Sequence, residues 1–343
     1  MKVVHLLPAL EQGGVETVVC DLVRALSSRG QGAENGEQWE SVVVSKGGRL
    51  VARIEAAGGR HIALDLKSKN LLTYFNRARN LRQVLKEERP DLVCVHSRVP
   101  AWLFVWANRG LGLRWISYAH GANSVSRYSE VMTKGDLVIV PSQFLADYLK
   151  TSYRIPEAKI RVIPNAVDAE RFDPDNLDRT FVAEKRREWG ICEGDRVLMA
   201  IGRITPVKGL MELIRTLPPD VKLVIVGGAD KHHRKYSESL RALAGPNVIF
   251  AGPQEKIPEC ISIADEVVSA NTTKPETFGL SVIEAYAMNK PVRAKRFGGV
   301  AEVMEAVERA GKPTLREAVL SLYELERQAE RTRAVYCEAL DMI

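Results

Sequence analysis

Short apolar runs alternate with amphipathic helical segments along the chain, and the alternation occurs in two successive sets. The first set begins with VVHLLPA and ends with LVIVPS, whereas the second reads VLMAIGR, KLVIVGG, NVIFAG and EVVSAN. Continuously apolar runs joined by helices are typical of parallel strands that are buried on both faces. Because 343 residues exceed what one core usually supports, the two sets predict two Rossmann-like α/β domains.

The boundary between the predicted domains lies in RVIPNAVDAERFDPDNLD, which begins at Arg161 and is rich in Pro, Asn and Asp. Such composition is typical of a linker. We therefore expect domains at 1–164 and 165–324. No apolar run reaches the ~18 residues that a membrane span needs, and the first strand lacks a signal-peptide cleavage site. These features predict a cytoplasmic protein.

The cysteines are far apart in the sequence and form no CxxC pair, which favours buried reduced thiols over disulfides or a zinc site. They are Cys20, Cys94, Cys192, Cys260 and Cys337.

Positive charge is concentrated in the first half of the chain. Residues 1–165 contain 23 Lys+Arg and 15 Asp+Glu, a balance of +8, against 26 and 28, or −2, in the remainder. Much of the charge lies in one helical segment whose basic residues follow apolar ones: Leu71, Leu72, Tyr74 and Phe75, then Arg77, Arg79, Arg82 and Lys86. Such a helix suits an anionic membrane or acceptor. A solvated outer helix of an α/β layer is the slightly favoured alternative.

Gly13 and Gly14 stand between the first predicted strand and a helix. Two glycines there allow a ligand to approach the backbone, and the helix N-terminus offers N–H groups to an anion. A tight turn without a ligand would use the same residues. The motif is not GxGxxG, and no strand-end acidic residue is placed to bind a ribose, so a nicotinamide or flavin dehydrogenase is excluded.

Arg203 and Lys208 follow the first strand of the second set, in GRITPVKG. At the carboxyl edge of a parallel sheet both could reach a diphosphate, the arginine as a fork and the lysine as a point charge. A solvated loop is the alternative for this pair considered alone.

The stretch PETFGLSVIEAYAMNKPV, from Pro275 to Val292, places Glu276 before a predicted helix and Glu284 on its second turn. The first N–H groups of that helix, near Gly279, could hold a phosphate. One carboxylate could contact a sugar and the other a ribose. Alternatively, Glu276 interacts with the helix dipole and Glu284 is a surface charge.

Together these motifs resemble a GT-B glycosyltransferase of the retaining family 4. The matching pieces occur in the family's order and span nearly the whole chain: QGGVE, YAHG at Tyr118–Gly121, VIPNAVDAERF, GRITPVKG, VIVGG, VIFAG, PETFGLSVIEAYAMNKPV and GGVAEVM. The resemblance implies two Rossmann-like domains with parallel sheets that face across a cleft. The first would bind the acceptor and the second the donor, and the terminal helix, about 325–343, would cross back to the first.

The resemblance also implies roles for individual residues. Arg203 and Lys208 would stabilise the charge that grows on the departing diphosphate, Glu284 would hold the ribose, and Glu276 would position the transferred sugar. His120 would contact the donor sugar near its reacting carbon, with a buried structural histidine as the alternative. Further donor contacts are expected from Gly14 and from the N–H groups of Phe278, Gly279 and Leu280. Acceptor-side contacts are expected from Gly13 and His96.

Retaining transferases of this kind are thought to use front-face attack, in which the leaving phosphate receives the acceptor's proton. Glu276 is therefore expected to position the sugar and not to act as a nucleophile. No cofactor or metal is expected. Asp173 and Asp175 have the spacing of a metal pair but lie in the linker. Asp230, His232 and His233 are expected to form an exposed loop.

The predicted function is transfer, with retention, from a nucleoside diphosphate sugar, most readily a UDP-sugar, to a glycan or lipid-linked acceptor in bacterial surface polysaccharide or lipopolysaccharide synthesis. The protein would act in the cytoplasm, with possible peripheral contact to the inner face of the plasma membrane and no role for nucleic acid. After Met304 the family's usual Gly-rich stretch is missing. The alternative is therefore a nucleotide-sugar-binding protein with lost or weak turnover.

Overall fold

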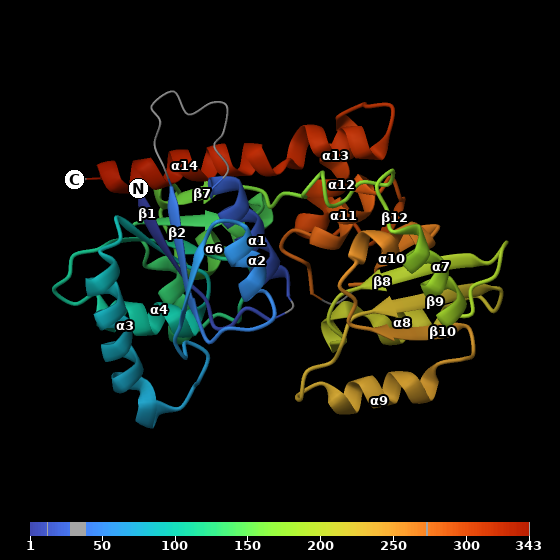
Figure 1. The fold of residues 1–343 in the computed structure, drawn as a ribbon, viewed down its shortest axis with the longest axis horizontal. Helices are drawn as coiled ribbons and strands as arrows, with labels where there is room; N and C mark the ends of the chain where they lie inside the picture. The colour runs from blue at the N-terminus through green and yellow to red at the C-terminus, as the bar shows by residue number, and fades with distance from the viewer. Residues whose placement is uncertain (12, 28–38, 272–273, 343) are drawn as a thin grey trace. The chain divides into compact units, whose positions relative to one another are not determined.

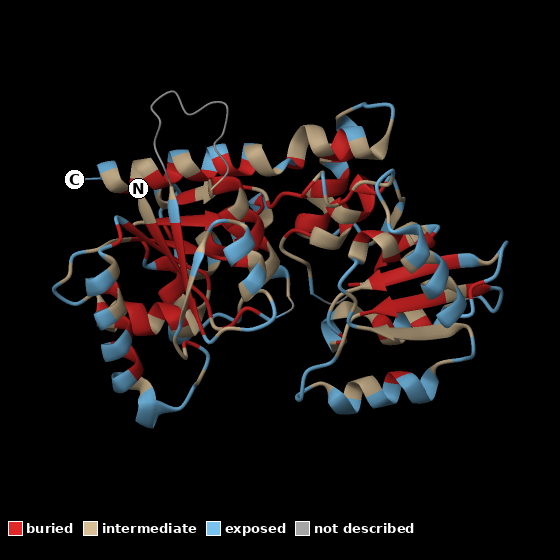
Figure 2. Ribbon diagram, viewed as in Figure 1, coloured by how far each residue is buried: buried red, intermediate tan, exposed pale blue. Residues whose placement is uncertain are grey.

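The computed structural model describes residues 1–11, 13–27, 39–271 and 274–342. The chain divides into two compact units, which are described separately. Unit 1 comprises residues 1–166 and 325–343, and unit 2 comprises residues 167–324. Figure 1 shows a parallel sheet with flanking helices in each unit. Most strands with long apolar runs lie in the interior of their unit and are coloured as buried in Figure 2, whereas the strand Val248–Gly252 is of intermediate burial.

Unit 1 contains a seven-stranded sheet in the order β3-β2-β1-β4-β5-β6-β7, and every pair of neighbouring strands is parallel. The strands are β1 (Lys2–Leu6), β2 (Glu40–Ser45), β3 (Arg60–Ala63), β4 (Leu92–Val95), β5 (Arg114–Tyr118), β6 (Leu137–Val140) and β7 (Ile160–Val162). The register pairs His5 with Cys94. The strand order reverses between β1 and β4, so the carboxyl ends of these strands mark a topological switch point.

Helices connect these strands. They are α1 (Gly14–Ser27), α2 (Val51–Ala56), α3 (Tyr74–Glu88), α4 (Arg98–Ala107), α5 (Arg127–Glu130), α6 (Gln143–Tyr153) and α14 (Leu325–Asp341), with short 3-10 turns η1 (Leu71–Thr73), η2 (Val131–Thr133) and η3 (Glu157–Lys159). Helix α14 packs against α1 and β5. It closes one face of the sheet with Val335 and Tyr336, which share a core cluster with Cys94 and Tyr118.

Unit 2 contains a five-stranded parallel sheet in the order β10-β9-β8-β11-β12. Its strands are β8 (Arg196–Ile201), β9 (Val221–Val226), β10 (Val248–Gly252), β11 (Glu266–Ser269) and β12 (Val292–Ala294). Its helices are α7 (Arg179–Glu188), α8 (Leu210–Arg215), α9 (Arg234–Leu243), α10 (Ile257–Ile263), α11 (Leu280–Ala287), α12 (Gly299–Arg309) and α13 (Leu315–Tyr323), with η4 (Pro206–Lys208). The prediction of two parallel α/β domains is confirmed. The strand order reverses between β8 and β11.

One detail of the fold differs from expectation. The segment expected to be a linker contributes Arg161 and Val162 to strand β7, which is too short to show a strand pattern. Helix α14 (Leu325–Asp341) occupies the range expected for the terminal helix and belongs to unit 1, whereas α13 belongs to unit 2, because Glu324 between them is extended (φ −74°, ψ 147°). As expected from the stretch that is missing after Met304, the described chain forms no strand between α12 and α13.

The exposure of the cysteine and arginine side chains differs from two further expectations. Cys192 is exposed and Cys337 is partly exposed, although none of the five cysteines is in a disulfide and the other three are buried. Arg77 is buried and hydrogen-bonds to Thr73 and to two backbone carbonyls, so it does not belong to the basic face of α3. No helix in the described ranges combines the length and the hydropathy that crossing a bilayer would require.

Candidate nucleotide-sugar site

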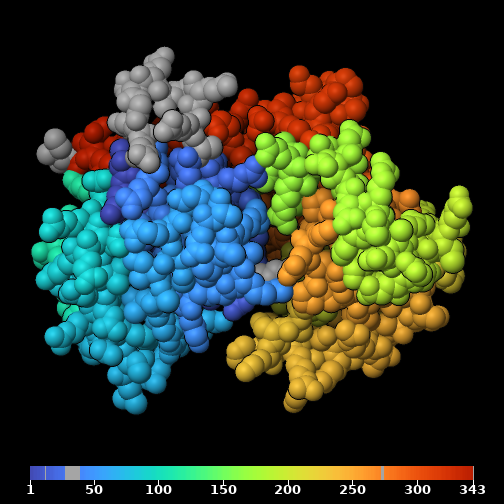
Figure 3. Space-filling model, viewed as in Figure 1, coloured from blue at the N-terminus to red at the C-terminus, as the bar shows by residue number. Residues whose placement is uncertain are grey.

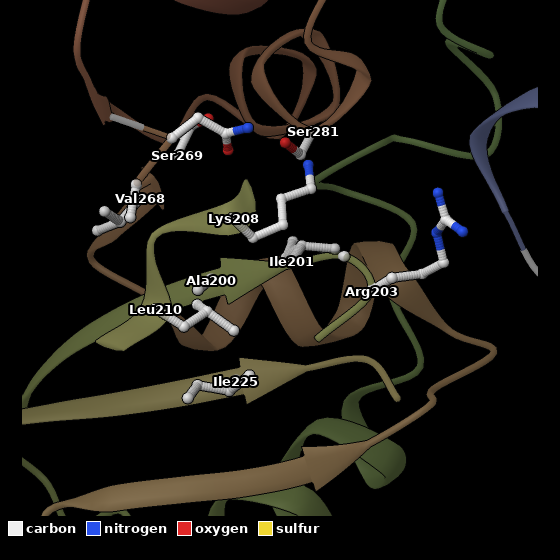
Figure 4. A pocket seen from close by; sticks show the side chains of 12 residues that line it. Ala200, Ile201, Arg203, Lys208, Leu210, Ile225, Val268, Ser269 and Ser281 are labelled. Atoms are coloured by element: carbon white, nitrogen blue, oxygen red, sulfur yellow. The ribbon is translucent and has the colours of Figure 1, made fainter. Parts of the chain in front are cut away.

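A pocket in unit 2 lies at the switch point, where the chain leaves β8 and β11. Its polar lining comes from three segments that are distant in sequence: the loop after β8, the end of β11, and the first turn of α11. The lining residues are Ala200, Ile201, Gly202, Arg203, Lys208, Leu210, Ile225, Val268, Ser269, Ala270, Asn271 and Ser281. Open parallel sheets bind ligands at such points. Figure 4 shows Lys208, from the loop after β8, and Ser281, from α11, among the side chains that line this pocket.

The backbone of the loop after β8 is fixed by glycines in conformations that favour glycine. Gly202 has φ +138° and Gly209 has φ +64°. A Cβ atom on Gly209 would lie 1.9 Å from the carbonyl oxygen of Ala270, so only glycine permits this loop to pack against the end of β11. A Cβ atom on Gly202 would lie 3.3 Å from Cε of Lys208. The loop therefore holds the Lys208 side chain over its own backbone.

Lys208 forms an ion pair with Glu276. The exposed fraction of the side chain is 29% for Lys208 and 16% for Glu276, so the pair is partly desolvated. The backbone of Glu276 is also held, because its carbonyl accepts a hydrogen bond of 2.9 Å from the N–H of Gly299. The structure thus brings together two residues that the sequence predicted for one site.

Arg203 lies differently from Lys208. Its side chain is exposed and, in Figure 4, extends away from Lys208 and Ser281. Within the described ranges the structure gives it no ion pair. Both members of the predicted Arg-Lys pair therefore line the pocket, but only Lys208 is held there by an ion pair, while the Arg203 side chain is exposed.

In the segment before α11, a side chain belongs to the core, whereas the backbone N–H groups are suited to a ligand. Phe278 is buried, and its ring packs edge-on against Tyr323 with ring centroids 5.5 Å apart. Its side chain therefore belongs to the core. Gly279 has φ +99° and precedes the first helical residue, Leu280. A helix start leaves N–H groups without intrahelical acceptors, and these suit a phosphate.

Glu284 is on the second turn of α11, as expected, and is partly exposed between buried residues of the same helix. It does not line the pocket, but Ser281 does. Residues three apart on a helix share a face, so Glu284 continues the side of α11 that begins with Ser281.

The sequence interpretation missed three polar lining residues, Ser269, Asn271 and Ser281. Asn271 is 7% exposed, and its Oδ1 has no hydrogen-bond partner among the described residues. A buried amide oxygen that lacks a partner and lines a pocket indicates a place for a ligand donor or water. Its position directly after a strand at the switch point is a signal that could have identified it.

In unit 1 the predicted residues His96 and His120 lie together. His96 follows β4 and is buried, and His120 follows β5 and is partly exposed. Nδ1 of His96 lies 3.0 Å from Nε2 of His120. Burial lowers the pKa of His120 to about 3 and that of His96 well below its usual value. Both imidazoles are therefore neutral at physiological pH.

Gly14 is the first residue of α1, and Gly13 accepts a hydrogen bond of 3.0 Å from the N–H of Thr17. A Cβ atom on Gly13 would lie 2.4 Å from Oε2 of Glu16. The neighbouring Gln12 of the QGGVE motif lies outside the described residues. Both glycines thus occupy the predicted strand-to-helix turn of unit 1.

The two acidic motifs considered as metal sites have local partners. Asp173 accepts a hydrogen bond from the N–H of Asp175 and lies 3.8 Å from Arg316. Asp230 pairs with His233 at 2.8 Å in an exposed loop. Both arrangements explain these carboxylates as elements of local structure.

The unit 2 site combines the cationic side chains of Lys208 and Arg203 with neutral polar groups and a helix start at the edge of a parallel sheet. This set suits an anionic ligand that carries hydroxyl groups, such as a phosphorylated sugar or a nucleotide. The neutral histidines of unit 1 can exchange hydrogen bonds without adding charge.

Two family models match consecutive parts of the chain. Residues 12–171 match the model described as Glycosyltransferase Family 4, and residues 181–333 match the model described as Glycosyl transferases group 1. The lipopolysaccharide 1,2-N-acetylglucosaminetransferase of Salmonella typhimurium is 27% identical over 246 residues, which are 67% of this chain and 61% of that protein. The chain thus aligns with less than two thirds of that relative.

Solved structures share the fold. A glycosyltransferase from Rickettsia africae has a TM-score of 0.80 at 23% identity, over 100% of this chain and 99% of that one. Anabaena HepE in complex with UDP-glucose has a TM-score of 0.80 at 18% identity, over 98% and 100%. At these identities the likeness concerns the fold, and it confirms the GT-B class expected from the sequence.

Proposed function

The chain belongs to the GT-B glycosyltransferases of the family 4 and group 1 type, and from this premise we propose that it transfers a sugar from a nucleoside diphosphate sugar to a glycan or lipid-linked acceptor. The observation that carries the proposal is the Lys208–Glu276 pair beside a polar pocket at the unit 2 switch point. Unit 2 would bind the donor and unit 1 the acceptor.

Lys208 supplies positive charge for the diphosphate, and the N–H groups at the start of α11 add to it. When the donor binds, the diphosphate competes with Glu276 for the ammonium of Lys208. Glu276 then becomes available to the hydroxyl groups of the transferred sugar. Arg203 is exposed, and its long side chain can turn toward the diphosphate once that charge is present. In this way the residues present supply cationic stabilisation of the leaving group without a metal ion.

We propose that the anomeric configuration is retained and that the leaving phosphate accepts the acceptor's proton. A nucleophilic carboxylate would have to lie next to the anomeric carbon, whereas the role proposed for Glu276 is to bind the hydroxyl groups of the transferred sugar. A UDP-sugar is the favoured donor, because HepE of the same fold is seen with UDP-glucose. The Salmonella relative favours an acceptor of the lipopolysaccharide type.

An acceptor attached to a membrane suits the tip of unit 1 formed by residues 67–79. Leu71, Leu72 and Phe75 there are 80%, 94% and 63% exposed, and exposed Lys67 and Lys69 precede them. Figure 3 shows this segment at the surface, in blue to teal. Apolar side chains beside basic ones fit an anionic lipid surface, so we propose peripheral contact with the inner face of the plasma membrane.

The test is incubation of the protein with UDP-, GDP- and ADP-sugars and with lipopolysaccharide-core or lipid-linked acceptors, with nucleoside diphosphate release and product mass as the readouts. Transfer supports the proposal, and NMR of the new linkage reports retention or inversion. Nucleotide binding without transfer or hydrolysis would favour the alternative, a binding protein of this fold. The missing strand between α12 and α13 motivates that alternative.

A further inference from the structure

Three histidines of unit 1 form one hydrogen-bonded chain. Nδ1 of His5 lies 3.1 Å from Nε2 of His96, and Nδ1 of His96 lies 3.0 Å from Nε2 of His120. The planes of neighbouring rings differ by 28° and 20°. The ring of Tyr118 stacks on His120 at 4.5 Å and fixes its plane. His5, on β1, had no role in the sequence interpretation, although a histidine inside an apolar strand is itself a signal.

Only two proton arrangements satisfy this chain when all three rings are neutral, because a neutral imidazole has one N–H donor and one acceptor nitrogen. In the first, His120 donates to His96, His96 donates to His5, and the N–H of His5 is on Nε2. In the second, His5 donates from Nδ1 to His96, His96 donates from Nδ1 to His120, and the proton of His120 is on Nδ1. The choice at His5 thereby determines the tautomer of His120.

The surroundings of His5 distinguish the two arrangements. His5 is fully buried, and its Nε2 has no hydrogen-bond partner among the described residues. In the first arrangement this nitrogen carries a buried N–H without an acceptor, whereas in the second it carries only a lone pair. Buried N–H groups without acceptors are rarer than acceptors without donors. The second arrangement is therefore favoured.

We propose that His5 and His96 are positioning residues that hold His120 as its Nδ1–H tautomer. The consequence of this tautomer for catalysis rests on the proposed function. His120 would donate a hydrogen bond to a sugar hydroxyl or a phosphate oxygen and would not act as a general base. The row of hydrogen-bonded histidines ends at His5 in a buried, apolar setting, so it cannot conduct protons to solvent. It sets only the ring orientation of His120 and the position of the His120 proton.

A metal ion is the competing explanation, because ligand atoms of His5, Cys94 and His96 lie within 4.8 Å of one another. A metal would bind the thiolate of Cys94, so it would first have to displace the proton that this buried thiol holds in the absence of an ion. The hydrogen-bond distances between the rings also account for the geometry without an ion. Metal analysis of the purified protein decides between the two, since stoichiometric zinc bound at this cluster would overturn the proposal.

The direct test is NMR of the whole chain labelled with ¹⁵N-histidine. The chain has six histidines, and single replacements assign them. Two-bond ¹H–¹⁵N correlations report which ring nitrogen carries the proton. We expect the His120 proton on Nδ1 in the unaltered protein, and a mixture of tautomers in His5→Leu. His5→Asn, whose amide can still donate to His96, should restore the Nδ1 form. A His120 proton on Nε2 in the unaltered protein overturns the proposal even if no variant folds.

Kinetics give a second readout. In His5→Leu we expect kcat to fall by about tenfold while KM for the donor changes little, because the buried residue alters only the orientation and tautomer of His120. His5→Asn should recover most of the rate, and UDP binding by unit 2 should stay the same in both. Equal kcat in His5→Leu and the unaltered protein contradicts the positioning role. An unaltered protein without any transfer activity contradicts the proposed function, while the NMR result stands separately.

Discussion

Lys208 and Glu276 form an ion pair across 68 positions of sequence, with the ammonium of one donating to the carboxylate of the other. The pair joins the loop after β8 to the segment before α11, the two motifs that the sequence assigned to a diphosphate and a sugar. In the absence of donor each residue neutralises the other. Donor binding must separate them, so the two residues affect nucleotide binding in opposite directions.

Lys208→Ala should weaken binding of free UDP by the ~1.5–3 kcal/mol of a hydrogen bond to a charged group, about 10- to 150-fold. Glu276→Ala should leave that affinity unchanged or raise it by up to about fivefold, because the partly exposed ion pair that competes with UDP is expected to be worth about 1 kcal/mol, near the upper end for surface pairs. Its turnover should nevertheless fall, since the sugar loses a contact needed in the reacting geometry. Calorimetry with UDP and transfer rates measure both effects. A similar loss of UDP affinity in the two variants would contradict this division of roles.

Glu284→Ala tests the ribose contact. If Glu284 holds the ribose hydroxyls, its loss should weaken binding of UDP and of the UDP-sugar equally, by about 10-fold or more, because the ribose is present in both. Glu305→Ala, which removes an exposed carboxylate of α12, is the matched control and should not change either affinity. Unaltered UDP binding in Glu284→Ala would show that Glu284 is a surface charge that does not contact the ribose.

Transfer should not require a divalent metal, since Lys208 and the start of α11 supply the positive charge at the diphosphate. Activity should be the same in EDTA and in added Mg²⁺ or Mn²⁺. Activity that EDTA abolishes and that either metal restores would falsify this expectation.

The fold could be predicted from the sequence because buried parallel strands have a distinctive pattern, and the apolar runs from VVHLLPA to EVVSAN correspond to strands of the two sheets. Strand β7 was missed, since three residues before a proline carry too little pattern. The end of α13 at Glu324 depends on tertiary structure, because the backbone there pairs with Val167.

Part of the candidate site could be predicted, because some of its residues belong to recognisable sequence motifs. Lys208, Glu276 and Gly279 carry motifs that can be read in sequence, and the structure groups Lys208 with Glu276. Asn271 and His5 carry no motif. Their importance comes from burial and from neighbours on other strands, such as His96 beside His5, which a single sequence does not reveal.

Membrane contact is predicted to depend on the apolar tip of unit 1. Replacing Leu71, Leu72 and Phe75 by Ser should abolish binding to vesicles that contain anionic phospholipid, with little loss of stability because these side chains are already exposed. Leu243→Ser, at a 40% exposed position of α9 in unit 2, is the control. Binding of the unaltered protein should weaken as salt rises, and sedimentation with vesicles measures both effects. Binding that is independent of salt, or equal in the tip variant, would refute the assignment.

The last prediction concerns pH and the buried histidines. Burial lowers the pKa of His5 to about 4 and that of His120 to about 3, and it lowers the pKa of His96 as well. The titratable side chains beside them on this face, Cys94 and Tyr118 from the sheet and Tyr336 from α14, have raised pKa values and stay neutral. On α1, the charged residues are Glu16, Asp21 and Arg24, and Asp21 pairs with Arg53.

Unfolded histidines take up a proton near pH 6.5, whereas the folded ones do so only near pH 4 or below, so the unfolded state binds more protons between these values. The free energy of unfolding should therefore fall as pH falls through this window, by ~1.4 kcal/mol per pH unit for each buried histidine. His5→Leu removes one group that the unfolded chain protonates. Between pH 6 and pH 5 the free energy of unfolding should therefore fall less steeply in this variant, by about 1.4 kcal/mol per pH unit. Exposed His232→Gln, the control, should leave it unchanged. Urea unfolding at several pH values measures the slopes, and equal slopes in His5→Leu and the unaltered protein would show that His5 is not buried in its neutral form.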